Sequence, residues 1–82
     1  MNKAWVLLHL REAHEELTRT INRIDNESSL DEVEFEIALA HMYNHLNTAW
    51  NSRSASDERL AAQSNDDFYM WRAYPTDIFM GR

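Results

Sequence analysis

Cysteine is absent from the 82-residue sequence, glycine occurs only at Gly81 and proline only at Pro75. Without cysteine, neither a disulfide nor a thiolate metal site can stabilise the fold. Without an earlier glycine, the chain has neither a Gly-rich phosphate-binding loop nor a Gly-x-Ser-x-Gly nucleophile elbow. Since nothing up to Tyr74 forces a break, these absences favour an all-α fold. They also leave no motif that predicts an enzyme.

Basic residues are few as well. The chain has 8 Lys and Arg against 14 Asp and Glu, which gives a net charge of −6. A protein that follows a phosphate backbone needs a field of positive charge. Trp50 with Arg53, and Trp71 with Arg72, pair aromatic rings with guanidinium groups, but the basic residues around them are too sparse for base stacking. The composition therefore predicts no nucleic-acid partner and no docking on anionic membranes.

Long hydrophobic runs are also missing. The early run from Ala4 to Leu8 has five residues and is followed at once by His9. A secretory signal needs about 7–15 apolar residues, and a membrane-spanning helix about 20. We therefore expect a single soluble domain in the cytoplasm. Because 82 residues bury only a thin core, close helix packing or oligomerisation has to supply the remaining stability.

The sequence does contain a helix-start signature, Ser29-Leu30-Asp31-Glu32, of the form Ser-x-x-Glu. In such a capping box the serine hydroxyl accepts the amide hydrogen of residue 32, and the glutamate reaches back to the amide of residue 29. The box separates two long apolar-periodic runs, which predict a helix over residues 3–24, with Asn2 as N-cap, and a second over residues 30–52. The polar connection, residues 25–28, is short enough to make these helices antiparallel.

The two predicted helices differ in their apolar patterns. The first has one stripe, formed by Val6, Leu10, Ala13, Leu17, Ile21 and Ile24. The second has two apolar sides. One consists of Phe35, Leu39, Met42, Leu46 and Ala49, and the other of Leu30, Val33, Ile37 and Ala40, continuing as Asn44, Asn47 and Asn51. Because the first helix can cover only one of these sides, we expect a homodimer in which two hairpins form a four-helix bundle, similar in outline to small dimeric four-helix bundles.

The composition shifts after Arg53. Serines and aspartates predict a short helix over residues 56–63, followed by an aromatic tail over residues 65–82 with Asn65 as a cap. In an antiparallel hairpin, the end away from the turn gathers Trp5, Leu8, Tyr43, Leu46 and Trp50. We expect the tail to cover this end with Phe68, Trp71, Tyr74 and Phe79.

The four histidines suggest a metal-binding alternative. His41 and His45 are four residues apart, so both rings project from one side of a helix, as in half of a zinc site. A turn near residue 27 places His9 level with His45 and His14 level with His41. His9 and His14 diverge by about 140°, so only one of them can join the pair. A Glu-x-x-His motif needs a glutamate three residues before the histidine, but the residue three before His41 is Ala38. Histidines at the edge of an amphipathic stripe are the competing interpretation.

These patterns lead to three functional hypotheses. The first is a small, non-enzymatic, homodimeric adaptor or regulator with no cofactor. Its association would use Phe35, Leu39, Met42 and Leu46, and its exposed partner surface would use Tyr43, Asn44, Asn47 and Trp50. The second is a metal-binding bundle in which zinc or iron is held by His41 and His45 with Glu34 or His9, and by a second subunit. The third is a small-molecule-binding bundle lined by Trp5, Trp50 and Trp71. Two further interpretations concern Asn44, Asn47 and Asn51. They could form a solvated face of the second helix, or Asn44 could lie between packed helices and fix their register.

Overall fold

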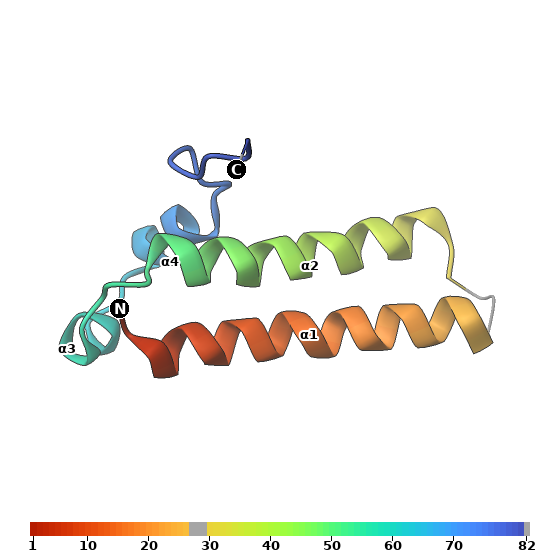
Figure 1. The fold of residues 1–82 in the computed structure, drawn as a ribbon, viewed down its shortest axis with the longest axis horizontal. Helices are drawn as coiled ribbons and strands as arrows, with labels where there is room; N and C mark the ends of the chain where they lie inside the picture. The colour runs from red at the N-terminus through yellow and green to blue at the C-terminus, as the bar shows by residue number, and fades with distance from the viewer. Residues whose placement is uncertain (27–29, 82) are drawn as a thin grey trace.

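The computed structural model describes residues 1–26 and 30–81, which form four helices and no strand. They are α1 (Lys3–Asn26), α2 (Glu32–Asn51), α3 (Asp57–Ala61) and α4 (Asn65–Arg72). The helices α1 and α2 lie side by side as an antiparallel hairpin, and α3 and α4 gather at the end that holds the N-terminus (Figure 1). The predicted all-α hairpin is confirmed.

The start of α2 differs from the prediction. The helix begins at Glu32, two residues after the predicted Leu30, and its N-cap is Asp31, whose carboxylate accepts the backbone N–H of Glu34 at 2.8 Å. A carboxylate at this position stabilises the helix because it meets both an unpaired amide and the positive end of the dipole. The predicted cap Ser29 lies outside the described residues. At the other side of the connection, α1 continues through Asp25 and Asn26 instead of ending at residue 24.

The start of α1 agrees with the prediction and also closes the hairpin. The side-chain oxygen of Asn2 accepts the backbone N–H of Trp5 at 3.2 Å, as an N-cap does. The Asn2 side-chain amide donates to the carbonyl of Ala55 at 3.0 Å, and its backbone N–H donates to the carbonyl of Arg53 at 2.6 Å. One residue therefore caps α1 and ties the N-terminus to the connection between α2 and α3.

The contact row between α1 and α2 lies beside the predicted apolar stripes. Side chains of α1 that meet α2 include His9, which contacts His45, and Arg23, which pairs with Glu34 at 2.6 Å. At 100° per residue this row lies about 75° from the α1 stripe, and the matching row on α2 lies about 100° from its Phe35–Leu46 stripe. Small residues fill the row between the polar contacts, and those buried there include Ala13, Thr20, Ala38 and Thr48.

As a result, both apolar stripes face the same side of the hairpin. On both helices the apolar stripe is rotated from the contact row in the same direction around the helix axis. Because the two right-handed helices are antiparallel, this rotation brings both stripes to one common side of the hairpin. We call this surface the open apolar face; it consists of Leu10, Leu17, Ile21, Ile24, Phe35, Leu39 and Leu46. Six of these side chains are 41–51% exposed, and Leu39 is half-buried. Met42, which was predicted at the interface, is buried within the hairpin itself.

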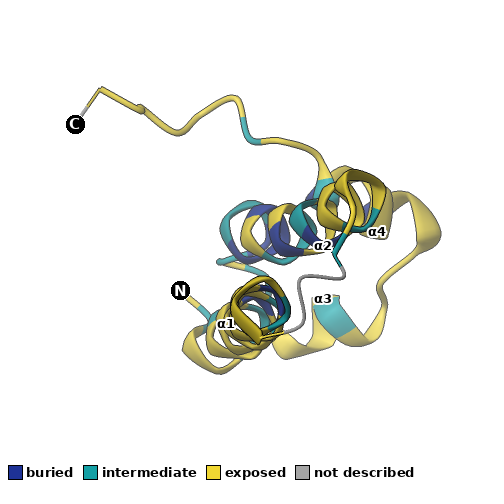
Figure 2. Ribbon diagram, turned by 90° about the vertical axis from the view of Figure 1, so that its right-hand side faces the viewer, coloured by how far each residue is buried: buried dark blue, intermediate teal, exposed yellow. Residues whose placement is uncertain are grey.

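The helices α3 and α4 occupy the other side of the hairpin, as the view along it shows (Figure 2). Each of these helices has a serine as its N-cap. Ser56 accepts the backbone N–H of Arg59 at 3.1 Å, and Ser64 and Asp67 form a reciprocal capping box with distances of 3.1 and 3.0 Å. Residues 65–72 are thus a helix capped by Ser64, which corrects the predicted continuous tail capped by Asn65. The predicted short helix over residues 56–63 is present but ends at Ala61.

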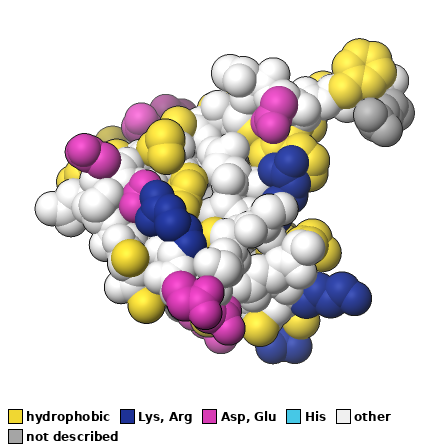
Figure 3. Space-filling model, turned by 90° about the vertical axis from the view of Figure 1, so that its left-hand side faces the viewer, with side chains coloured by type: hydrophobic (Ala, Val, Ile, Leu, Met, Phe, Trp, Pro, Cys, Tyr) yellow, Lys and Arg dark blue, Asp and Glu magenta, His cyan; other side chains and the backbone are white. Residues whose placement is uncertain are grey.

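The segment from α4 to the end of the tail covers the hairpin end only in part. Of the four aromatic residues predicted to do so, Trp71 is buried, whereas Phe68, Tyr74 and Phe79 are 45–67% exposed. The tail is held by a hydrogen bond from the Trp50 indole N–H to Asp77 at 2.8 Å and by a ring contact between Tyr43 and Tyr74. Figure 3 shows hydrophobic side chains of the tail standing away from the body of the molecule.

Candidate functional site

A cavity of about 270 Å³ lies between α1, α2 and α4, on the side of the hairpin opposite the open apolar face. Three helices and the connection before α4 line it with Trp5, His9, His41, Asn44, His45, Thr48, Gln63, Phe68, Trp71 and Arg72. Its residues therefore come from sequence positions far apart, and α4 is needed to complete it. We call it the His–Trp cavity.

Two histidines form one wall of the His–Trp cavity. The Nδ1 atoms of His9 and His45 are 3.0 Å apart, so one ring donates a proton that the other accepts. The rings of Trp5 and His9 pack in a T-shaped arrangement, with ring centroids 4.4 Å apart. Among the described residues, His9 Nε2 is buried without a hydrogen-bond partner. Burial and the neighbouring charge of His45 lower the pKa of His9, which favours its neutral ring.

Trp5 is fixed at the end of this wall. Its indole N–H donates to the Ser52 hydroxyl at 2.7 Å, and that hydroxyl donates in turn to the carbonyl of Thr48. Ser52 is buried, so these bonds are shielded from competing water. The position of the Trp5 ring is therefore set by two hydrogen bonds and by packing on His9.

Two asparagines of α2, Asn47 and Asn51, hold α4 in place. Asn47 donates to the carbonyl of Arg72 at 2.9 Å, and Asn51 donates to the carbonyls of Trp71 and Ala73 at 2.9 and 2.8 Å. The last carbonyls of a helix have no donor within it, so these side chains supply the missing hydrogen bonds. The row is neither a solvated face nor a free surface.

This arrangement corrects one predicted surface residue and refines three others. Asn47 is only 7% exposed and lies beneath α4, so it is not part of an exposed partner surface. Asn44 is half-buried and lines the His–Trp cavity, and Trp50 is half-buried with the Arg53 guanidinium 3.8 Å from its ring centroid. Tyr43 is 51% exposed, as expected of a surface residue.

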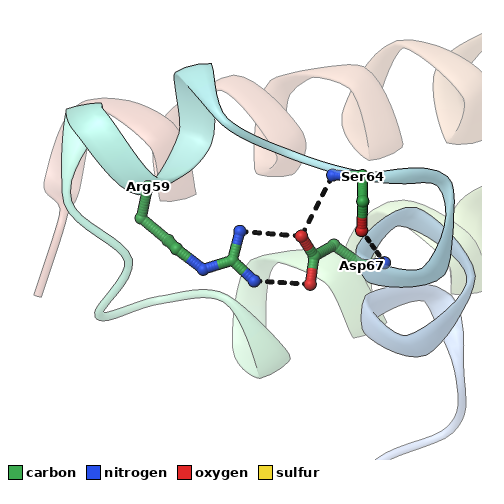
Figure 4. A network of polar contacts seen from close by, with 3 residues as sticks. All are labelled: Arg59, Ser64 and Asp67. Carbon is green, nitrogen blue, oxygen red and sulfur yellow. Dashed lines mark hydrogen bonds and ion pairs between the residues drawn. The ribbon is translucent and has the colours of Figure 1, made fainter.

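A polar network fastens α3 to α4 (Figure 4). Both terminal nitrogens of Arg59 donate to the two carboxylate oxygens of Asp67, one of them at 2.7 Å, and Ser64 donates its backbone N–H to the same carboxylate. These bonds hold the pKa of the Asp67 carboxyl well below its usual range. Arg59 also lies 5.3 Å from the ring centroid of Trp71, so the network supports a wall of the cavity.

The residues of the metal hypothesis are only partly brought together within one chain: His9, His41 and His45 line the same cavity, but Glu34 does not. His9 contacts His45 as the register predicted, and His14 is exposed on another part of α1. Glu34 is engaged by Arg23, and the nearest carboxylate to His41 is Glu16 at 3.7 Å. Over residues 1–26 and 30–81, no group of three or more histidine and acidic side chains is placed to hold an ion. A site completed by a second subunit stays a prediction.

Only two of the three tryptophans named in the small-molecule hypothesis line the His–Trp cavity. Trp5 and Trp71 line the His–Trp cavity, whereas Trp50 points to Asp77 and takes no part in the lining. Phe68 and Arg72 complete the lining, and sequence reasoning missed both because it treated their segment as a tail. The Ser64-x-x-Asp67 capping box was the available signal for a helix there.

None of the helices in the described ranges has both the length and the hydropathy needed to cross a membrane. Comparisons with protein-family models, with curated proteins and with solved structures yield no match for this chain. The function therefore has to be argued from the surfaces and sites of the molecule itself.

Proposed function

We propose that this chain is a small, non-enzymatic interaction protein that works as a homodimer. In this dimer the open apolar faces of two hairpins pack together into a four-helix bundle. The observation that carries the proposal is the placement of seven large apolar side chains, from both long helices, on one side of the hairpin, whereas the described helices α3 and α4 lie on the other side. The absence of cysteine fits a reducing compartment, so we propose the cytoplasm as its location.

The size of the open apolar face suits a stable dimer. The 24 residues of α1 make a helix about 36 Å long, and two packed helices are about 20 Å wide. Their common side therefore covers about 700 Å², close to the roughly 800 Å² that each partner buries in a standard interface. A monomer rarely leaves a large contiguous group of apolar side chains in water.

The composition of this face favours a second copy of the chain as its partner. Its seven positions carry no charged residue, so two copies can meet without a buried ion. A two-fold dimer places the same patch on both subunits, which is the commonest solution for a single self-complementary surface. Tyr43 and Trp50, which are not among these seven residues, form the proposed surface for a further protein partner.

Light scattering on a sizing column tests the proposal with untagged protein. The wild-type chain should have about twice its 9.7 kDa mass. Leu39→Glu should give a monomer because it places a charge in the centre of the apolar contact. Val33→Glu is the matched control, since Val33 is 64% exposed on another side of the same helix.

Circular dichroism should show that both variants keep their helices, and Leu17→Glu repeats the test from α1. A wild-type monomer would contradict the proposal. So would a Leu39→Glu protein that retains the dimer mass.

A further inference from the structure

We propose that the His–Trp cavity is a binding site for a small aromatic carboxylate. The cavity lies on the α4 side of the hairpin, opposite the open apolar face, so it stays accessible whether the chain is a monomer or a dimer. The inference is therefore independent of the proposed function. It assigns a ligand class to a site that dimerisation does not use.

The volume and walls of the cavity fit a single planar ring system. At about 270 Å³ the cavity lies just below the usual range of ligand pockets, which begins near 300 Å³. Trp5, Phe68 and Trp71 present aromatic rings from two different helices. Aromatic surfaces of this kind favour stacked or edge-on contact with another ring. A ring with a short side chain fits this space, and a nucleotide does not.

The walls are held in place before any ligand arrives. Trp5 is fixed by its hydrogen bond to Ser52, and Trp71 is buried, with its carbonyl bound by Asn51. The ordering of these side chains is therefore complete in the free protein. A preformed cavity binds a ligand at lower entropic cost than one that must be assembled.

The charges of the residues that line the cavity favour an anionic ligand. Among the described residues, the lining contains one guanidinium and three imidazoles but no carboxylate, although the whole chain carries a net charge of −6. In the part of the chain that the structure describes, no carboxylate pairs with Arg72, whose guanidinium lies 4.7 Å from the Phe68 ring centroid. Arg59, in contrast, is already neutralised by Asp67. A guanidinium beside an apolar wall is suited to a carboxylate, which it can bind through two parallel hydrogen bonds.

A free amide in the lining adds a polar contact for the ligand. The half-buried Asn44 forms no side-chain hydrogen bond with another described residue, whereas its neighbours Asn47 and Asn51 both hold α4. A carboxamide can both donate and accept, so it can orient a carboxylate or a polar group on the ring. Together, an arginine, an amide and three aromatic walls define an aromatic carboxylate better than a purely apolar ligand.

Phenylacetate and its neutral isostere phenylacetamide are the probes for this proposal. Neither absorbs strongly where tryptophan is excited, so emission from Trp5 and Trp71 can report binding. Phenylacetate should change this emission saturably, and phenylacetamide should bind at least about tenfold more weakly because it cannot form the charged pair with Arg72. Arg72→Gln should remove most of this difference between the two ligands.

Arg53→Gln is the matched control, because Arg53 stacks on Trp50 outside the cavity and should leave both affinities unchanged. Asn44→Phe should block binding by filling the cavity while circular dichroism shows retained helices. The proposal is wrong if phenylacetate causes no saturable change or if phenylacetamide binds equally well. It is also wrong if Arg53→Gln weakens phenylacetate as much as Arg72→Gln does, since the attraction would then be non-specific.

Discussion

The two broad sides of the hairpin are built from different chemistry. On one side, α4 is attached by directed contacts, with two asparagines on its terminal carbonyls and an ion pair joining it to α3. On the other side, seven apolar residues form a surface that is largely exposed in the part of the chain that the structure describes. Directed bonds define one geometry, whereas an apolar surface accepts any partner of matching shape. The first side therefore suits a defined cavity, and the second suits association.

The largest difference between the sides should appear when one apolar residue is truncated on each. Trp71→Ala should lower the free energy of unfolding by about 3 kcal/mol, because Trp71 is buried and its loss leaves a void. Leu17→Ala should cost only about 1 kcal/mol in dilute protein, since Leu17 is already 46% exposed. Urea unfolding followed by circular dichroism measures both values.

Protein concentration sharpens this comparison. If the open apolar face is the dimer contact, the cost of Leu17→Ala should grow as the concentration rises, because the wild type is stabilised by association. The cost of Trp71→Ala should not change with concentration. Equal and constant costs for the two variants would remove the distinction between the sides.

The next effect concerns the directed contacts alone. Asn51→Ala removes two hydrogen bonds and leaves the carbonyls of Trp71 and Ala73 without a donor, which should cost about 2 kcal/mol. Hydrogen exchange of the α4 amides should then be faster in Asn51→Ala than in the wild type, whereas exchange in α1 should stay the same. Asn22→Ala is the control, since Asn22 is exposed on α1 and should change neither stability nor exchange in α4. Unchanged exchange in the Asn51 variant would mean that the hydrogen bonds of Asn51 are not needed to hold α4, since Asn47 still binds the carbonyl of Arg72.

The hairpin was predictable because its signals are local. Two long periodic runs, an Asn2 cap and a short connection specify two antiparallel helices without reference to distant residues. The position of His9 opposite His45 could be predicted from the register of the hairpin alone. The short helix α4 was missed because an aromatic-rich sequence after two aspartates resembles a tail, although Ser64 and Asp67 form a local capping box.

The rest depends on contacts that a periodic pattern does not contain. The stripe on α1 was visible, but the helix packs on α2 through a neighbouring row, where Trp5 meets Ser52 and Arg23 meets Glu34. Each of these bonds needs a specific residue about 10 to 50 positions away. Asn47 was expected on the surface for the same reason, since only the position of α4 shows what its amide binds. The His–Trp cavity could not be predicted without that helix.

The smallest effect should be a dependence of stability on pH that belongs to the cavity side. The pKa of His9 is lowered from 6.5 by burial and by the charge of His45, so the unfolded chain binds a proton more readily than the folded one. The contribution of neutral His9 is therefore complete above about pH 6.5 and is lost as the pH falls toward its folded pKa. His41 lines the same cavity, and its Nδ1 lies 3.7 Å from a carboxylate oxygen of Glu16.

The midpoint of thermal unfolding should accordingly fall between pH 7.5 and pH 5.5 in the wild type and fall less in His9→Gln, whose amide can still bond His45. His14→Gln is the matched control, because His14 is exposed on α1 and its replacement should leave the pH dependence unchanged. If both variants flatten the profile equally, the dependence arises from general charge and not from the wall of the cavity. If only His9→Gln does so, the half-buried histidine pair is the origin of a pH response that the open apolar face, which has no titratable group, cannot produce.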